Sequence, residues 1–213
     1  MTALSRATRI RNPAVFICDI QEKFEKAIFE FPKIITTTTK LLRAASTLSL
    51  PVYITTQNRS RLGETHASLQ KYLLSPSGSP AANIRADIDK TLFSMITPEL
   101  DSLLPNTAKG EAPLDVIIVG LETHICITQT TLDLLERGHR VYILVDGVSS
   151  INAEERGVAL ARLRDAGAIV TTSESVLFEI VGDAGHESFK AITGLVKETK
   201  EETREALGVL AKI

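Results

Sequence analysis

The stretch VIIVGLETHICITQ, residues Val116–Gln129, decides how this chain is expected to fold. It opens with a continuously apolar run that ends at Gly120, which is typical of a strand buried on both faces of a parallel sheet. The residues that follow, TQTTLDLLERG, carry leucines at helical spacing and end at Gly138, so they predict a helix with a C-terminal stop. Cys126 therefore lies just past the carboxyl end of a central strand, where the N–H groups and dipole of a helix favour a thiolate.

Strands and helices alternate along the rest of the chain. Short apolar or β-branched runs predict strands at Ala14–Ile20, Val52–Thr56, Ile84–Asp87, Arg140–Val145 and Ala168–Thr171. Helical periodicity predicts helices at Phe31–Leu50, Pro98–Leu104, Ala153–Ala166 with Asn152 as its cap, Ser173–Val181 and Ser188–Val196. Gln57–Asn83 lacks periodicity and predicts a long loop. The expected fold class is α/β, a three-layer α-β-α arrangement around a mostly parallel, Rossmann-like central sheet.

The length and composition predict one globular domain. The chain has 213 residues, 44% of them hydrophobic, which is enough for one full-sized core, and no linker divides it. We expect the domain to cover residues 13–197, after an N-terminal tail at 1–12. Residues 198–213 form a charged, helix-prone extension, in which Leu207 and Leu210 could dock on a neighbour but a solvated helix is the preferred interpretation.

Charge and cysteine content exclude several classes of protein. A net charge of −2 with interspersed signs is unlike the basic surface of a nucleic-acid binder, and no apolar run is long enough to span a membrane. Two cysteines argue against a disulfide framework or a structural zinc site and favour a reducing, cytoplasmic location. The first 14 residues are basic, as in mitochondrial presequences, so a mitochondrial location is the alternative, although a basic tail is the commoner explanation.

Three reactive side chains lie at or near the carboxyl ends of expected strands: Asp19, Lys90 and Cys126. Such ends meet at one edge of a parallel sheet, where α/β proteins place their chemistry. Each residue also has an ordinary alternative: a salt bridge or cap for Asp19, a solvated surface position for Lys90 and core packing for Cys126. We expect Cys18 to be a packing residue on the strand face opposite Asp19.

The segments around these three residues resemble those of a known family. FICDIQEKF around Asp19, DKTLFSM around Lys90 and VGLETHICITQTTLDLLERGHRVYILVDGVSS around Cys126 resemble the isochorismatase-like superfamily of cysteine hydrolases, particularly its eukaryotic isochorismatase domain-containing subgroup. The resemblance covers about residues 13–197 and implies a mechanism. Asp19 would be the base, Lys90 the cation that holds the pair in place, and Cys126 the nucleophile that attacks an amide carbonyl to give a thioester acyl-enzyme.

The resemblance also implies an oxyanion hole, and residues near the three reactive side chains are candidates for lining the substrate site. It implies a non-proline cis peptide at Leu121–Glu122, which would turn the backbone N–H groups of Glu122 and Cys126 toward the oxyanion. Gln57 is a candidate polar contact to substrate, and His124 a candidate at the mouth of the site. Phe24 is a candidate pocket wall, the alternative being an ordinary core aromatic. The Glu122 side chain has a bland alternative role, compensation of the helix dipole.

Departures from the superfamily narrow the activity. Its nicotinamidases carry an Asp-x-His metal site after the second strand, whereas TTQNRSRLGETH here has no such pair, so we expect no metal and no nicotinamidase activity. Superfamily members that cleave the vinyl ether of isochorismate lack the nucleophilic cysteine, so Cys126 favours C–N hydrolysis. Gly120 and Gly147 are expected to be turn residues at strand ends, and no phosphate-binding glycine motif is present, so no cofactor is expected.

The leading hypothesis is a cofactor-free cysteine hydrolase acting on a small-molecule amide, and the resemblance suggests a homodimer or homotetramer. The alternative is a catalytically idle protein of the same fold that works through protein association. A nucleotide-binding α/β protein is a third hypothesis, which has only analogy of fold behind it. Preferential labelling of Cys126 over Cys18 by iodoacetamide, lost on Asp19→Asn, would favour the enzyme.

Overall fold

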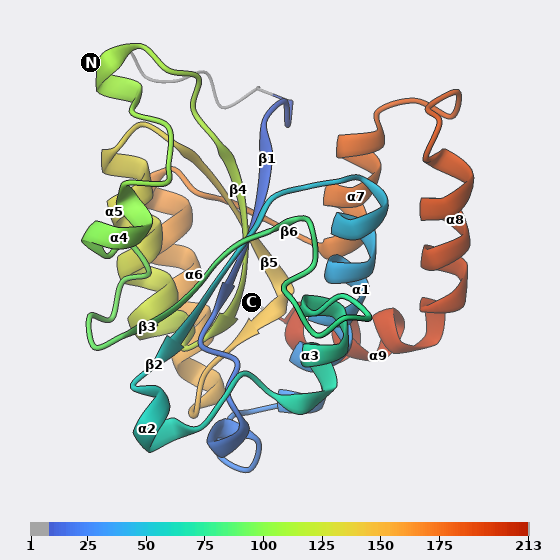
Figure 1. The fold of residues 1–213 in the computed structure, drawn as a ribbon. Helices are drawn as coiled ribbons and strands as arrows, with labels where there is room; N and C mark the ends of the chain where they lie inside the picture. Colours follow the sequence, from blue (N-terminus) through green and yellow to red (C-terminus); the bar gives the residue numbers. More distant parts are fainter. Residues whose placement is uncertain (1–8, 213) are drawn as a thin grey trace.

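A parallel sheet of six strands organises the computed structural model, which describes residues 9–212. The strand order is β3-β2-β1-β4-β5-β6, and every neighbouring pair is parallel (Figure 1). The strands are β1 (Pro13–Cys18), β2 (Val52–Gln57), β3 (Ile84–Lys90), β4 (Asp115–Leu121), β5 (Arg140–Ser149) and β6 (Ile169–Thr171). All six therefore end at the same edge of the sheet, which faces the lower part of Figure 1.

Helices cover both faces of the sheet, which confirms the predicted three-layer fold (Figure 1). On one face lie α4 (Pro98–Asp101), α5 (Thr128–Glu136) and α6 (Ala153–Ala166). On the other lie α1 (Phe31–Thr47), α3 (Ala67–Leu73), α7 (Ser173–Val181), α8 (Phe189–Glu198) and α9 (Lys200–Leu210). Shorter helical segments are η1 (Glu22–Phe24), α2 (Arg59–Leu62), η2 (Thr107–Lys109) and the π-helical turn η3 (Thr123–Ile127). None of the helices in residues 9–212 is long and apolar enough to cross a membrane.

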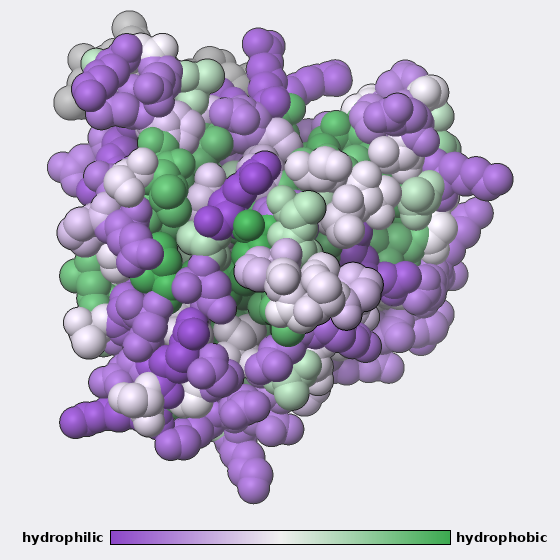
Figure 2. Space-filling view, viewed as in Figure 1, coloured by the Kyte–Doolittle hydropathy of each residue, from purple (hydrophilic) through white to green (hydrophobic). Residues whose placement is uncertain are grey.

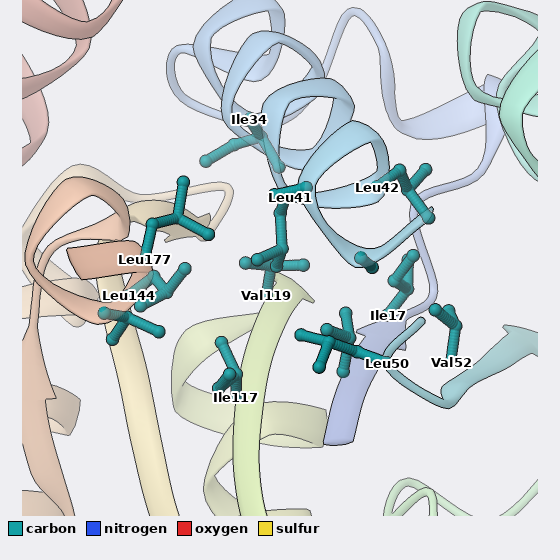
Figure 3. Packing of buried hydrophobic residues seen from close by; sticks show 14 of the residues in the cluster. Ile17, Ile34, Leu41, Leu42, Leu50, Val52, Ile117, Val119, Leu144 and Leu177 are labelled. Atoms are coloured by element: carbon teal, nitrogen blue, oxygen red, sulfur yellow. The ribbon is translucent and has the colours of Figure 1, made fainter. Parts of the chain in front are cut away.

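The sheet separates two hydrophobic cores, because successive side chains of a strand point to opposite faces. In the core on the α1 side, Leu41 of α1 packs above Ile117 and Val119 of β4 (Figure 3). In the core on the α5 side, the alternate strand residues Ile118 and Phe16 pack with Leu134 of α5. The central strand is buried throughout, as the uninterrupted apolar run predicts.

Gly120 lies inside β4, opposite Cys18 of β1, and not at a turn beyond the strand. Its φ is 130°, and an added Cβ would lie 2.1 Å from the carbonyl oxygen of Cys18. Only glycine fits this position, because any side chain would push the two strands apart. The expectation of a strand-end turn was also wrong for Gly147, which lies within β5.

Several boundaries differ from the sequence-based expectation. The segment expected to be a long loop holds α2 and α3, both too short to show helical periodicity. The third strand runs on to Lys90, and β5 continues to Ser149, so both reach the functional edge. Asn152 precedes α6 as expected, but its side chain makes no capping hydrogen bond.

The C-terminal segment is helical as expected, but the preference for a solvated extension was wrong. In α9, Thr203, Ala206 and Leu210 are buried against the rest of the molecule, with Leu207 partly buried. The buried Lys40 of α1 donates to Thr203 Oγ1 at 2.8 Å, and Arg156 of α6 donates to the carbonyl oxygen of Leu210 at 2.9 Å. These cations, together with the apolar face, hold the helix in place.

The predicted N-terminal tail at 1–12 is only partly covered by the structure, since residues 1–8 lie outside the described range. The backbone N–H groups of Arg11 and Asn12 donate to Asp115 Oδ2 at 2.7 and 2.9 Å, and Ile10 is buried. Residues 10–12 are therefore fixed against the start of β4.

Candidate active site

A buried ion pair joins two of the three predicted catalytic residues. Lys90 Nζ lies 2.7 Å from Asp19 Oδ2, and the two side chains are 0% and 1% exposed. Asp19 follows β1, and Lys90 is the last residue of β3, two strands away in the sheet. A lysine and an aspartate withdrawn from water in this way must be paired, because an isolated buried charge is very costly. The solvated alternative for Lys90 was therefore wrong.

The ammonium group of Lys90 is held by further acceptors. Nζ donates to Gln57 Oε1 at 2.8 Å and to the carbonyl oxygens of Leu92 and Phe93, both at 3.1 Å. Burial opposes the charged form of Lys90, but the acidic groups of Cys18, Asp19 and Cys126 outweigh it and raise the pKa of the ammonium above its usual value. Lys90 thus supplies a fixed positive charge at the sheet edge.

The backbone at Asp19 leaves the strand conformation. Its φ is 54°, in the left-handed region that is uncommon for residues other than glycine, and it follows directly after the last residue of β1. The carboxylate is oriented by Thr55 of β2, whose hydroxyl donates to Asp19 Oδ1 at 2.8 Å. One carboxylate oxygen is therefore occupied by Thr55 and the other by Lys90.

Cys126 lies in η3, the π-helical turn between β4 and α5, and is buried with 6% of its surface exposed. Irregular helical turns of this kind are frequent at functional sites. Its carbonyl oxygen accepts from Thr130 Oγ1 at 2.6 Å, and the same oxygen of Thr130 accepts from the N–H of Met95 at 2.9 Å. Thr130 thereby ties the cysteine turn to the loop that follows Lys90.

Cys18 does not lie on the face opposite Asp19, so that part of the sequence-based expectation was wrong. Strict alternation would separate the two side chains, but the left-handed backbone of Asp19 breaks it. The Cys18 thiol donates to Asp19 Oδ2 at 3.4 Å, and Cys18 and Cys126 belong to the same buried cluster. Burial, followed by the influence of Cys126 and the negative charge of Asp19, raises the pKa of the Cys18 thiol well above its usual value.

Gln57 is positioned as a partner of Lys90. Its side-chain oxygen Oε1 accepts from Lys90, and its side-chain nitrogen Nε2 donates to the backbone carbonyl oxygen of Thr91 at 2.9 Å. Both ends of the amide are thus occupied by protein groups. The side chain of the fully buried Gln21 holds the backbone of Gln57 at two points. Gln21 Oε1 accepts from the Gln57 backbone N–H at 2.7 Å, and Gln21 Nε2 donates to the Gln57 backbone carbonyl oxygen at 3.2 Å. Gln21 could not be predicted to have this role, since a single glutamine on a strand-to-helix turn carries no distinctive pattern.

Glu122 and His124 form a second polar group beside Cys126. The peptide bond Leu121–Glu122 is cis, at the position that the resemblance implied. Glu122 Oε2 accepts from the N–H of Ile151 at 3.0 Å and lies 3.9 Å from His124 Nδ1. His124 Nδ1 is also 3.0 Å from Ser150 Oγ. These contacts connect the cysteine turn to the loop after β5.

Phe24, the candidate pocket wall, is half-buried in η1 and packs against the core on the α1 side. Cys18 and Cys126 belong to the core on the other side of the sheet. Phe24 is thus partly buried against that core, and its place at a substrate pocket stays a prediction.

No group of three or more histidine, cysteine, aspartate or glutamate side chains in residues 9–212 is arranged to hold a metal ion. In the view of Figure 2, the surface around and below α2, at the edge where the strands end, carries mainly hydrophilic residues.

Comparison with known families identifies the class of this fold. The isochorismatase domain family matches residues 13–175, so the chain belongs to the isochorismatase family and has the fold of the hydrolases in that family. The chain is 37% identical over 200 residues to isochorismatase domain-containing protein 2 of Xenopus laevis, covering 93% of this chain and 91% of the relative.

Two further relatives carry different functional names. The secreted isochorismatase effector Isc1 of Phytophthora sojae is 39% identical over 204 residues, which is 93% of each chain. Among solved structures, the MAR1 ribonuclease of Caenorhabditis elegans superposes with a TM-score of 0.79 at 41% identity, covering 89% of this chain and 93% of the other. The shared fold is therefore certain, while the names of its members span more than one activity.

Proposed function

We propose that this protein is a cysteine hydrolase that cleaves the C–N bond of a small amide through a thioester on Cys126. The observation that carries the proposal is the fully buried Asp19–Lys90 pair, whose ammonium group is stabilised by the acidic group of Cys126. A carboxylate alone would oppose ionisation of a nearby thiol, so the lysine is needed to balance the two negative charges. In this proposal Lys90 supplies the charge, Asp19 the base and Cys126 the nucleophile.

The proposed reaction begins with transfer of the Cys126 thiol proton to the Asp19 carboxylate. The thiolate then attacks the amide carbonyl carbon, forming a C–S bond and a tetrahedral oxyanion. Collapse of this intermediate breaks the C–N bond, and the leaving amine takes the proton from Asp19. A water molecule next gives a proton to Asp19 and attacks the thioester; the acid is released, and the proton returns to the sulfur.

In the same proposal the oxyanion is stabilised by backbone N–H groups of Glu122 and Cys126. Glu122 precedes η3 and Cys126 lies within it, so both groups belong to the turn that carries the nucleophile. Loss of one such donor typically slows an acyl transfer by about a hundred- to a thousandfold. A substrate that can place its carbonyl at this turn would need little more from the protein than a pocket of suitable shape.

A ribonuclease is the second candidate, because a 41% identical structural relative carries that name. The composition is against it: the chain has 24 lysines and arginines and 26 aspartates and glutamates. Proteins that bind RNA usually concentrate positive charge to neutralise phosphates. The catalytically idle alternative must be tested alongside, since a family fold by itself does not establish turnover.

The test offers a panel of small primary amides to the purified full chain and measures the ammonia that hydrolysis releases. Mass spectrometry of the quenched protein then detects an acyl group on Cys126. Cys126→Ser and Asp19→Asn should abolish ammonia release. Lys109→Met, at an exposed lysine far from the pair, is the control and should not change it. A labelled RNA should be cleaved no faster than by Cys126→Ala.

Three results would overturn parts of this proposal. Ammonia release that survives in Cys126→Ala would exclude the thioester route. RNA cleavage that depends on Cys126 would favour the ribonuclease. Absence of any turnover, with Cys126 alkylated by iodoacetamide no faster than a simple thiol, would favour the idle protein. The predicted homodimer or homotetramer stays a prediction, and light scattering after gel filtration of the same preparation would test it.

A further inference from the structure

A pocket lies at the amino edge of the sheet, away from the residues of the proposed reaction. Its volume is about 310 Å³, and it is enclosed by the end of α4, the segment from Leu104 to Ala108, the end of α5 and His139. We call it the α4–α5 pocket. The volume is at the lower end of the range for small-molecule sites in proteins. Its lining residues have no part in the proposed reaction, so what it binds is a separate question.

His139 is the buried polar residue of this pocket, with 1% of its surface exposed. Nδ1 accepts from the backbone N–H of Leu114 at 3.1 Å, so in the neutral ring the proton must be on Nε2. Burial and the charge of Arg137 favour the neutral ring, because they lower its pKa although Asp101 opposes them. Among residues 9–212 the Nε2–H group has no acceptor, and it is not sealed off from the pocket that His139 lines.

A buried N–H group without an acceptor costs free energy, and native proteins rarely leave one in that state. The acceptor for His139 Nε2 must therefore come from whatever fills the pocket. Water can supply it in any polar pocket, whereas a ligand requires that the other lining groups match its charges. The remaining groups of the lining meet that requirement.

Two further donors of the lining have no partner in the part of the chain that the structure describes. Arg137 uses Nε for Asp101 Oδ1 at 2.8 Å and Nη1 for a carbonyl oxygen of α5 at 3.1 Å, which leaves Nη2. Asn106 uses Oδ1 to accept from the N–H of Lys109, which leaves Nδ2. With His139 they offer three nitrogen donors, and a guanidinium group is especially suited to a carboxylate.

The same lining carries more negative than positive charge. Glu136 is exposed at the end of α5 and has no partner within the described range, and Asp101 uses only Oδ1, for Arg137. Two carboxylates beside one guanidinium group oppose a simple anion but suit a ligand that also carries an ammonium group. Leu104 and Pro105 add apolar atoms, so a hydrocarbon group has a place beside the charges.

We propose that the α4–α5 pocket binds a small zwitterion of the class of α-amino acids with an apolar side chain. The carboxylate of the ligand accepts from His139 Nε2 and Arg137 Nη2, and its ammonium group is held by the carboxylates of Asp101 and Glu136. Because the pocket lies at the amino ends of the strands, this ligand is distinct from the substrate of the proposed reaction. No bond is made or broken in the site.

The experiment follows the imidazole nitrogens of the isotope-labelled full chain by NMR while leucine is added at about pH 7.5, where the histidines are mostly neutral. For a ligand of this size we expect a dissociation constant in the millimolar range and a shift of His139 Nε2 that saturates. His186 is the internal control. Its Nδ1 also accepts a backbone N–H, from Ser188 at 3.0 Å, but it lies outside the pocket and should not shift.

Two relatives of leucine test the class of ligand on the unaltered protein. Isocaproate lacks the ammonium group, and isoamylamine lacks the carboxylate. Each should bind about tenfold more weakly than leucine, because a charged group of the pocket loses its partner. Arg137→Met should weaken the binding of leucine by about the same factor. Arg61→Met, at an exposed arginine of α2 near the opposite edge of the sheet, is the matched control and should not change it.

Four results would overturn the proposal. Absence of any shift at His139 Nε2 up to about 50 mM leucine would mean that the pocket holds water only. An equal shift at His186 would show that leucine binds without a specific site. Isocaproate or isoamylamine binding as tightly as leucine would show that the pocket does not select a zwitterion. Unchanged affinity in Arg137→Met would contradict the contact assigned to the carboxylate.

Discussion

Lys90 is the residue on which the charge balance of the site depends. Removal of one partner from a buried ion pair leaves the other charge uncompensated, which typically costs about 3–5 kcal/mol. Lys90→Met should therefore lower the free energy of unfolding by an amount of that order, measured by urea denaturation at neutral pH. It should also slow alkylation of Cys126, because the thiol loses the cation that favours its ionisation.

The matched control for this prediction is Lys109→Met, which removes an exposed lysine in η2 and should change neither quantity by much. Alkylation of Cys126 at an unchanged rate in Lys90→Met would show that the ammonium group does not control the thiol. In that case the buried pair would be structural.

Gln57 tests whether a polar residue at the edge binds substrate or positions Lys90. Its amide is occupied by Lys90 and by the carbonyl of Thr91, so we expect Gln57→Leu to lower kcat and leave KM nearly unchanged. The loss should be roughly ten- to a hundredfold, as for a hydrogen bond to a charged group. Gln129→Leu, at an exposed position of α5, is the control; a rise in KM alone in Gln57→Leu would restore the role of substrate contact.

At the scale of single residues, the sequence predicted which strand ends meet better than it predicted the local backbone, and the catalytic roles stay predictions. Asp19 and Lys90 could be predicted to meet because both lie at the ends of parallel strands. The position of the Cys18 side chain could not be predicted. Strand alternation holds only while the backbone stays extended, and nothing in the sequence Cys18–Ile20 predicts the left-handed backbone of Asp19. Partners such as Thr55 and Gln21 were missed because a single polar residue near a strand end has no distinctive pattern.

The helix α9 is docked by buried cations as well as by apolar packing. Burial lowers the pKa of Lys40, whose Nζ donates to Thr203 Oγ1, and it also lowers the pKa of Arg156, which donates to carbonyl oxygens of Leu210 and β5. Thr203→Val removes the acceptor but keeps the shape. We expect it to lower the free energy of unfolding by about 1–3 kcal/mol, because a buried donor is left unsatisfied.

The double variant Lys40→Met with Thr203→Val is the control for that prediction. It replaces both partners by apolar groups of similar size, so it should recover most of the stability that Thr203→Val loses. Urea unfolding followed by circular dichroism gives all four free energies of the cycle. Additive effects of the two substitutions would show that the contact contributes nothing to the docking of α9.

Among the elements, those with a strong period were predicted and those without one were not. The buried strand β4 and the helix α7 were found from their apolar patterns. The docking of α9 was missed because its sequence, KEETREALGVL, is mostly charged, and the partners that receive it lie far away in α1 and α6. The short helices α2 and α3 were missed because seven residues or fewer cannot show a helical period.

For the molecule as a whole, the residues of the proposed reaction lie at the carboxyl edge of the sheet, and a histidine that should make stability depend on pH lies at the amino edge. His139 precedes β5 at the amino edge, is 1% exposed, and its Nδ1 accepts from the N–H of Leu114 at 3.1 Å. Burial, helped by the charge of Arg137, lowers the pKa of His139 below its usual value. The unfolded chain therefore binds a proton at a higher pH than the folded one, so stability should fall as the pH drops below about 6.5.

His139→Asn keeps an acceptor for Leu114 and removes the titrating ring, so it should lose less stability than the wild type between about pH 7.5 and about pH 5.5. The difference should be on the order of 1 kcal/mol, measured by urea unfolding at the two pH values. Leu134→Val loosens the packing of a buried residue whose carbonyl oxygen accepts from the His139 N–H, removes no titrating group and should keep the wild-type dependence. Because His139 and Cys126 lie at opposite ends of the molecule's strands, His139→Asn should also leave the pH profile of Cys126 alkylation unchanged. A parallel shift of both profiles would mean that the two edges are coupled through the sheet, and that the fold does not keep stability and chemistry apart.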